Sequence, residues 1–162
     1  TISPASIILP PASLGHSLSL SQRVVGEYGD KSYKMRFEVE VTSVRLTVIG
    51  LSPLGVTLFT LTQEQDGAPV VTGVHSGLPL DPKYLLFDLY LAYWPSAVLG
   101  PALERQSMQL ESRADGLVRS VTRHDGKPIA EVVYRAKPSK HRGIIVKHFD
   151  TPYRLTITTL GR

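Results

Sequence analysis

The chain has 162 residues, of which 42% are hydrophobic and 20% are charged, a composition that favours one globular domain and excludes intrinsic disorder. It contains no cysteine, which excludes disulfides and thiolate catalysis, and no apolar run approaches the roughly 18 to 20 residues that cross a bilayer as a helix. The formal net charge of +4 is compatible with simple solubility or with contact to an anionic surface.

The N-terminal stretch TISPASIILPPAS is rich in Pro, Ser and Ala. We expect residues 1–13 to form an extended tether, with Ile7, Ile8 and Leu9 docked on the domain, and residues 14–162 to form one domain. Because the chain begins with Thr1 and not with Met, we also expect a processed product, with a signal peptide or a lipid-bearing cysteine upstream.

Apolar and polar residues alternate through most of the chain. SYKMRFEVEV (residues 32–41) and YRLTITTL (residues 153–160) each place apolar side chains on one face and polar ones on the other, as half-buried strands do. Dipeptides typical of tight hairpin turns separate such runs: Asp66-Gly67, Asp115-Gly116 and Asp125-Gly126, with Gly29-Asp30 as a weaker signal. We therefore predict a mainly β fold with about ten strands in a curled antiparallel sheet.

One segment, LDPKYLLFDLYLAYWP (residues 80–95), breaks the alternation. Asp81 is placed to cap a helix, Pro82 suits its first position, and Pro95 ends it. This helix of about 13 residues is apolar nearly all round. Of its two charged residues, we expect Asp88 to be solvated or singly hydrogen-bonded. The following SAVLGPALE is expected to be a loop with a short helical turn.

A helix of this kind suits a lid over the concave side of a half-barrel, and the apolar surface left over would line a ligand cavity. The alternative is that the same side chains interdigitate as a packed core, because alternation shows which face is dry but not whether the dry space is filled. Trp94 could lie at the mouth of the cavity or in the core. Candidate cavity walls are Met35, Phe37, Val39, Leu46, Leu58, Met108 and Leu155, and candidate lid or rim residues are Tyr84, Leu85, Leu89 and Trp94.

No constellation of catalytic or metal-binding residues is visible. The five histidines lack metal-ligand spacing, and the chain has no GxSxG elbow and no glycine-rich phosphate loop. We expect no cofactor, no metal and no enzymatic activity. The basic stretch YRAKPSKHRGIIVKH (residues 134–148) lacks the interleaved aromatic residues of a nucleic-acid site, so we expect a solvated loop or a contact with anionic headgroups.

The turn in VRLTVIGLSPLGVTLFTL (residues 44–61) carries leucines where a turn normally favours polar residues. Pro53-Leu54-Gly55 resembles the protruding turn of the outer-membrane lipoprotein receptor LolB, with Ser52 in place of asparagine. That family is an eleven-stranded half-barrel with a helical lid around a cavity for acyl chains, and its exposed leucine helps to pass lipoproteins to the membrane. The resemblance implies that Leu51, Pro53 and Leu54 contact a membrane or a partner; the alternative is that both leucines fold back onto the core.

The stretches LPPASL, GLSPLGVTLFTL and DLYLAYWP also resemble a family of LolB-like bacterial lipoproteins associated with aryl-polyene biosynthesis clusters. This resemblance implies an envelope lipoprotein on the periplasmic face, held in the outer membrane by a lipidated upstream cysteine. It would bind or transfer a lipid or an acylated protein, with a periplasmic LolA-like carrier as a possible partner and no nucleic acid. The alternatives are a scaffold lipoprotein with a packed barrel, and an enzyme acting on a lipid-linked substrate, which a buried and partnered Asp or His beside the cavity would favour.

Overall fold

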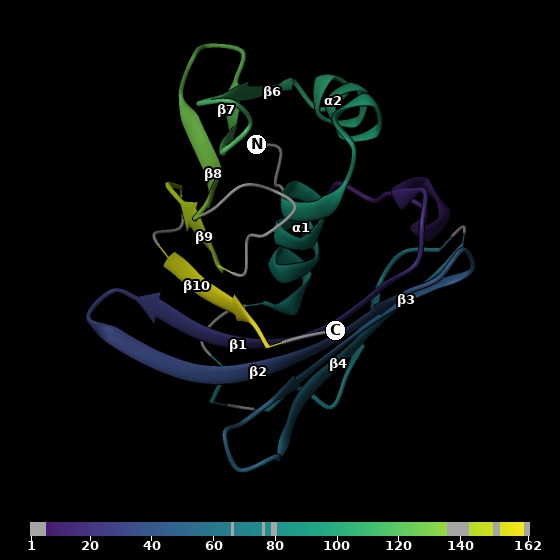
Figure 1. The fold of residues 1–162 in the computed structure, drawn as a ribbon, viewed down its shortest axis with the longest axis vertical. Helices are drawn as coiled ribbons and strands as arrows, with labels where there is room; N and C mark the ends of the chain where they lie inside the picture. The colour runs from purple at the N-terminus through teal and green to yellow at the C-terminus, as the bar shows by residue number, and fades with distance from the viewer. Residues whose placement is uncertain are drawn as a thin grey trace.

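The computed structural model describes residues 6–65, 67–75, 77–78, 81–135, 143–150 and 153–160, which form one curled sheet around a central helix (Figure 1). The strands of the described residues are β1 (Leu18–Tyr28), β2 (Lys31–Val41), β3 (Arg45–Leu51), β4 (Thr57–Glu64), β5 (Val70–Thr72), β6 (Met108–Arg113), β7 (Val118–Arg123), β8 (Pro128–Tyr134), β9 (Gly143–His148) and β10 (Tyr153–Thr159). The helices are α1 (Pro82–Tyr93), α2 (Ser96–Glu104) and the short 3₁₀ helix η2 (Pro11–Leu14).

The ten strands pair in the order β5-β4-β3-β2-β1-β10-β9-β8-β7-β6, and every pair is antiparallel. The chain builds the first half of the sheet up to β5, crosses through the helices, and builds the second half from β6 back to β10. The pairing of β10 with β1 joins the two halves, while β5 and β6 remain as separate edges. The predicted open, curled antiparallel sheet is confirmed.

The helix predicted from its end signals is present as α1. The Asp81 side chain accepts a hydrogen bond of 3.0 Å from the Lys83 N–H, Pro82 occupies the first position, and the helix ends at Tyr93, two residues before Pro95. The segment expected to be a loop with one helical turn is instead the nine-residue helix α2. The Pro95 carbonyl accepts the first backbone hydrogen bonds of α2, and burial of its apolar face (Leu99, Ala102 and Leu103) stabilises it.

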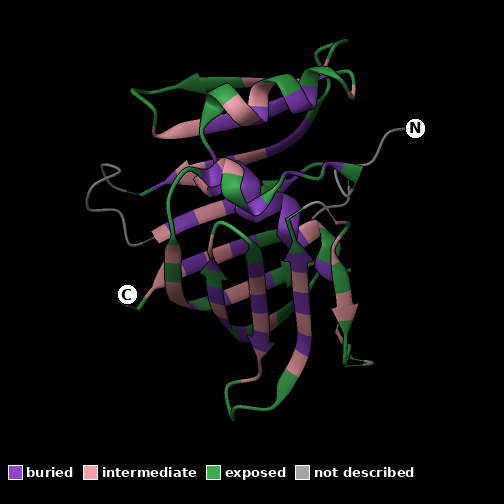
Figure 2. Cartoon of the chain, turned by 90° about the vertical axis from the view of Figure 1, so that its right-hand side faces the viewer, coloured by how far each residue is buried: buried purple, intermediate pink, exposed green. Residues whose placement is uncertain are grey.

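The concave face of the sheet and α1 form the core. In Figure 2, buried residues recur at intervals along the strands, and nine of the twelve α1 residues are buried, including Asp88. Before β1, Ile7 and Leu9 are buried and Ile8 is exposed. The chain then turns into η2, which ends at a left-handed Gly15 (φ 94°), so residues 11–14 are helical and not extended. Residues 1–5 of the expected tether and Asp66 of one expected turn lie outside the described residues.

Candidate functional site

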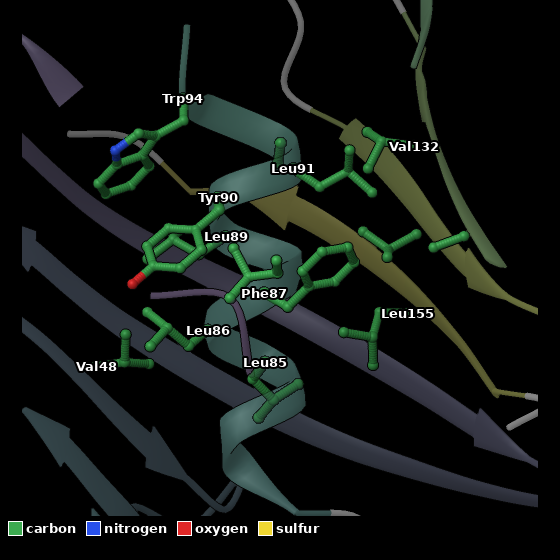
Figure 3. Close-up of a cluster of buried hydrophobic side chains, with 14 of the residues drawn as sticks. Val48, Leu85, Leu86, Phe87, Leu89, Tyr90, Leu91, Trp94, Val132 and Leu155 are labelled. Carbon is green, nitrogen blue, oxygen red and sulfur yellow. The ribbon is translucent and has the colours of Figure 1, made fainter. Parts of the chain in front are cut away.

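The space between α1 and the concave face of the sheet is the candidate site. It holds a cavity of about 20 Å³, room for about one water molecule. Figure 3 shows α1 side chains filling the space toward β3, β8 and β10. The helix therefore occupies the concave side in this state, and an acyl chain could enter only if α1 moved.

The predicted wall and lid residues divide between the cavity and the packed core. Phe37, Val39 and Leu155 line the cavity, together with Leu85 and Leu89 from α1. Three other predicted wall residues are buried in the core without lining it, namely Met35, Leu46 and Met108. The last, Leu58, is half-buried in a separate surface hollow.

Of the two remaining lid residues, Tyr84 is half-buried with its ring edge-on to His148. Trp94 is 1% exposed, and its indole N–H donates a 2.8 Å hydrogen bond to the Ser13 hydroxyl. The Tyr90 ring packs edge-on against it at 4.9 Å (Figure 3). Of the two positions expected for Trp94, the structure therefore shows the core and not the mouth.

The environment of Asp88 differs from the one predicted from the sequence. Its carboxylate was expected to be solvated or singly bonded, yet it is 4% exposed. One oxygen lies 2.5 Å from His148 Nε2 on β9, and the other accepts a 2.8 Å hydrogen bond from the Tyr153 hydroxyl on β10. Asp88 points toward the sheet because the rest of α1 fits the same concave surface, and both carboxylate oxygens then need partners.

His148 also differs from the prediction of a solvated basic stretch. It is buried, its ring stacks on Tyr153 with a centroid separation of 4.3 Å, and Phe87 packs edge-on against it. Burial, followed by the nearby Asp88 charge, raises the pKa of the Tyr153 hydroxyl well above its usual value, so this hydroxyl remains a donor. Arg135 and Lys147 of that stretch are exposed, as predicted, and Lys137, Lys140, His141 and Arg142 lie outside the described residues.

Further polar contacts hold α1 along its length. The Tyr90 hydroxyl donates to Gln63 Oε1 (3.0 Å) and also hydrogen-bonds the Leu9 backbone, so α1 is joined to β4 and to the N-terminal segment. The Gln22 amide on β1 donates a 2.8 Å hydrogen bond to the Tyr93 hydroxyl. Burial raises the pKa of both tyrosines to about 12.

Two side chains from the second half of the sheet satisfy the last carbonyls of α1. Arg119 on β7 donates a 2.7 Å hydrogen bond to the Leu91 carbonyl, and the Tyr134 hydroxyl on β8 donates to the Ala92 carbonyl. Sequence reasoning missed these contacts. The available signal was polar residues at inward positions of otherwise alternating strands, as with Gln22 beside Val24 and Gln63 beside Leu61.

The leucine-bearing turn connects β3 to β4. The Ser52 carbonyl accepts from the Gly55 N–H, the Ser52 hydroxyl accepts from the Val56 N–H, and Gly55 is left-handed at φ 88°. The Leu54 side chain is 95% exposed, and Val56 beside it is 56% exposed. Pro53 is also exposed, whereas Leu51 is half-buried, so only Leu51 turns partly toward the protein.

Within the described ranges, no three His, Asp or Glu side chains come together as a metal site, and none of the helices is long and apolar enough to span a membrane.

The half-barrel around a central helix defines a protein with a LolA-like fold. It is similar to LolA superfamily protein NE2245 from Nitrosomonas europaea, with a TM-score of 0.50 and 7% identity over 98% of this chain and 88% of that one. It also matches an outer membrane lipoprotein-sorting protein domain from Vibrio parahaemolyticus, with a TM-score of 0.46 and 9% identity over 90% and 84% of the two chains.

The chain belongs to the family described as protein of unknown function (DUF3261), which matches residues 19–161. No curated protein matches it. At these identities the structural likeness shows the fold alone. The expected LolA/LolB-like fold is therefore confirmed, while the LolB-like role of the turn and the association with aryl-polyene biosynthesis stay predictions.

Proposed function

We propose that this protein binds an acyl-bearing molecule, a lipid or an acylated protein, between α1 and the concave face of the sheet, and passes it to or from a membrane in the periplasm. One observation carries the proposal: a helix that is apolar nearly all round fills the concavity of an open half-barrel (Figure 3). An acyl chain can replace the contacts that this helix makes, because both present hydrocarbon to the same wall.

Burial of an acyl chain yields enough free energy to displace α1 in part. Burying a methylene group is worth about 0.8 kcal/mol, so a chain of about a dozen methylenes gains on the order of 10 kcal/mol. That gain offsets the partial undocking of α1, whose apolar side chains would be left to cover the entering chain. Opening on the side of the β5 or β6 edge would need no break in the ladder between β1 and β10.

The exposed turn supports the membrane part of the proposal. Burying Leu54 in an apolar phase is worth about 2 kcal/mol, too little to hold a protein alone but enough for a transient contact beside a lipid anchor. The anchor, the outer membrane as its location, and a LolA-like carrier as the partner are parts of the same proposal. They rest on the resemblance of Pro53-Leu54-Gly55 to the LolB turn.

A non-catalytic scaffold is the second candidate, and the small cavity favours it. With room for about one water molecule, the barrel in this state is packed. An enzyme is the weaker alternative although Asp88 and His148 are buried and partnered. Both oxygens of Asp88 are already bonded, one to His148 Nε2 and the other to the Tyr153 hydroxyl. We therefore propose binding and not catalysis.

Displacement of a fluorescent hydrophobic probe separates carrier from scaffold. The purified protein is titrated with the probe and then with fatty acids and an acylated peptide, after circular dichroism has shown that it is folded. Saturable probe binding that micromolar acyl chains reverse supports the carrier. A folded protein without saturable binding contradicts it and favours the scaffold.

A further inference from the structure

The cavity between α1 and the sheet has one polar feature that the packing leaves unsatisfied. Its wall is hydrocarbon except for Gln22 on β1 and Tyr93 and Asp88 on α1. Gln22 is 2% exposed and occupies an inward position on β1, where its neighbours of the same face are apolar. A buried amide in such surroundings needs partners for its oxygen and for both N–H groups.

These three side chains differ in how many of their polar atoms have hydrogen-bond partners. Gln22 Nε2 donates a hydrogen bond of 2.8 Å to the Tyr93 hydroxyl. The two Asp88 oxygens are bonded to His148 and Tyr153. Among the described residues, however, none donates to Gln22 Oε1, and none accepts from the second N–H of Nε2. Gln22 therefore offers a free acceptor and a free donor at the cavity.

We propose that Gln22 is a polar subsite for a hydroxyl group carried by the cargo's acyl chain. This inference rests on the proposed function and narrows its substrate class to hydroxylated acyl chains. A hydroxyl donates to Oε1 and accepts from Nε2, so it complements both free functions of the amide. A carboxylate or phosphate group fits poorly, because it would lie in the same cavity as the Asp88 carboxylate and would be repelled.

Such a subsite favours a hydroxylated acyl chain partly because binding a plain chain costs free energy. A plain chain that enters the cavity covers the Gln22 amide with hydrocarbon and leaves its oxygen unpaired, whereas a hydroxylated chain satisfies it. A site built to hydrogen-bond a hydroxyl discriminates strongly against the analogue that lacks it. We expect about a tenfold preference, the effect of one buried hydrogen bond.

The test compares plain fatty acids with hydroxylated ones of equal length, with the hydroxyl at several positions along the chain, by displacement of a fluorescent hydrophobic probe. For the wild-type protein, we expect at least one hydroxylated acid to bind about tenfold more tightly than its plain counterpart. Gln22→Met, which keeps the length of the side chain and removes the amide, should bind both acids equally. Gln63→Met is the matched control, because Gln63 is equally buried but bonded to Tyr90 and Leu9. It should keep the preference.

The outcomes distinguish this inference from the function on which it rests. If the wild-type protein binds none of the acids, the proposed function fails. If it binds plain and hydroxylated acids equally, the function stands and the hydroxyl subsite is wrong, with a single water as the occupant of the cavity. This comparison needs only the wild-type protein, so the inference remains testable even if Gln22→Met does not fold. A preference that survives in a folded Gln22→Met also overturns it.

Discussion

At the scale of single residues, Asp88 shows how tightly the closed state is held. It is the only acidic residue of α1, and its side chain and that of His148 are each 4% exposed. Removing one partner of a buried hydrogen bond leaves the other group desolvated and unpaired, which costs more than the bond itself contributes.

We predict that Asp88→Ala lowers the free energy of unfolding by about 3 kcal/mol or more, because both His148 and the Tyr153 hydroxyl lose their buried partner. The matched control is Glu64→Ala, which removes the exposed Arg45–Glu64 pair and should cost less than about 1 kcal/mol. Urea denaturation followed by circular dichroism measures both. Equal losses in the two variants would mean that the Asp88 contacts do not hold α1 to the sheet.

In contrast to the buried, polar Asp88, Leu54 is an exposed apolar residue that contributes little to folding. We predict that Leu54→Glu leaves the melting temperature unchanged, because the side chain is 95% exposed, and weakens binding to anionic vesicles. Val44→Glu is the control, since Val44 is 62% exposed in the connection at the opposite end of β3. Vesicle binding that is equally weakened by both variants would point to charge alone and contradict a specific role for the turn.

At the scale of elements, the end signals of α1 and the alternation of the strands could be predicted from the sequence. Asp81, Pro82 and Pro95 act on their immediate neighbours, and alternation follows from the geometry of one strand. The return of β10 to pair with β1 and the bond between Asp88 and His148 could not be predicted. Both join segments far apart in the chain, and no local pattern specifies them. For the same reason, alternation left open whether the concave space was filled.

The junction of β3 with the leucine-bearing turn depends on one glycine. A Cβ at Gly50 would lie 2.2 Å from the Phe59 ring of the paired strand β4, next to an irregularity in the register at Leu51. Phe59 is fully buried, so its ring cannot swing out into solvent to make room.

We predict that Gly50→Ala destabilises the protein by about 1 to 3 kcal/mol through overpacking. Gly67→Ala makes the matched control, because a Cβ there meets no atom within 4 Å and the backbone lies outside the left-handed region. There the same substitution should change stability by less than about 1 kcal/mol. Thermal denaturation compares the two variants. A Gly50→Ala protein as stable as wild type would show that Phe59 repacks freely.

At the scale of the whole molecule, α1 holds the two halves of the sheet together through groups that must stay neutral. The Tyr90 hydroxyl bonds to Gln63 on β4, and the Tyr134 hydroxyl bonds to the last turn of α1 from β8. Burial raises the pKa of Tyr134 as well as that of Tyr90, which reaches about 12. Unfolding exposes these hydroxyls to water and returns their pKa to about 10.

The sign of the pH dependence follows from this difference. Between about pH 10 and pH 12 the folded protein keeps the Tyr90 proton that the unfolded chain loses, so the unfolded state gains stability as pH rises. The contribution of Tyr90 is fully present below pH 10 and falls by up to about 1.4 kcal/mol per pH unit above it. We predict that the free energy of unfolding declines steeply from about pH 10 upward, and that Tyr90→Phe makes this decline shallower.

Urea denaturation at pH 8, 10 and 11 measures the decline. Leu86→Ala serves as the control, because Leu86 is equally buried on α1 and carries no titrating group. It should lower stability by about 2 to 5 kcal/mol at every pH and leave the steepness of the decline unchanged. If Tyr90→Phe and Leu86→Ala give parallel curves, Tyr90 titrates as freely in the folded protein as in the unfolded chain. Its hydroxyl would then not be sealed between α1 and β4, and the helix would be docked more loosely than its contacts indicate.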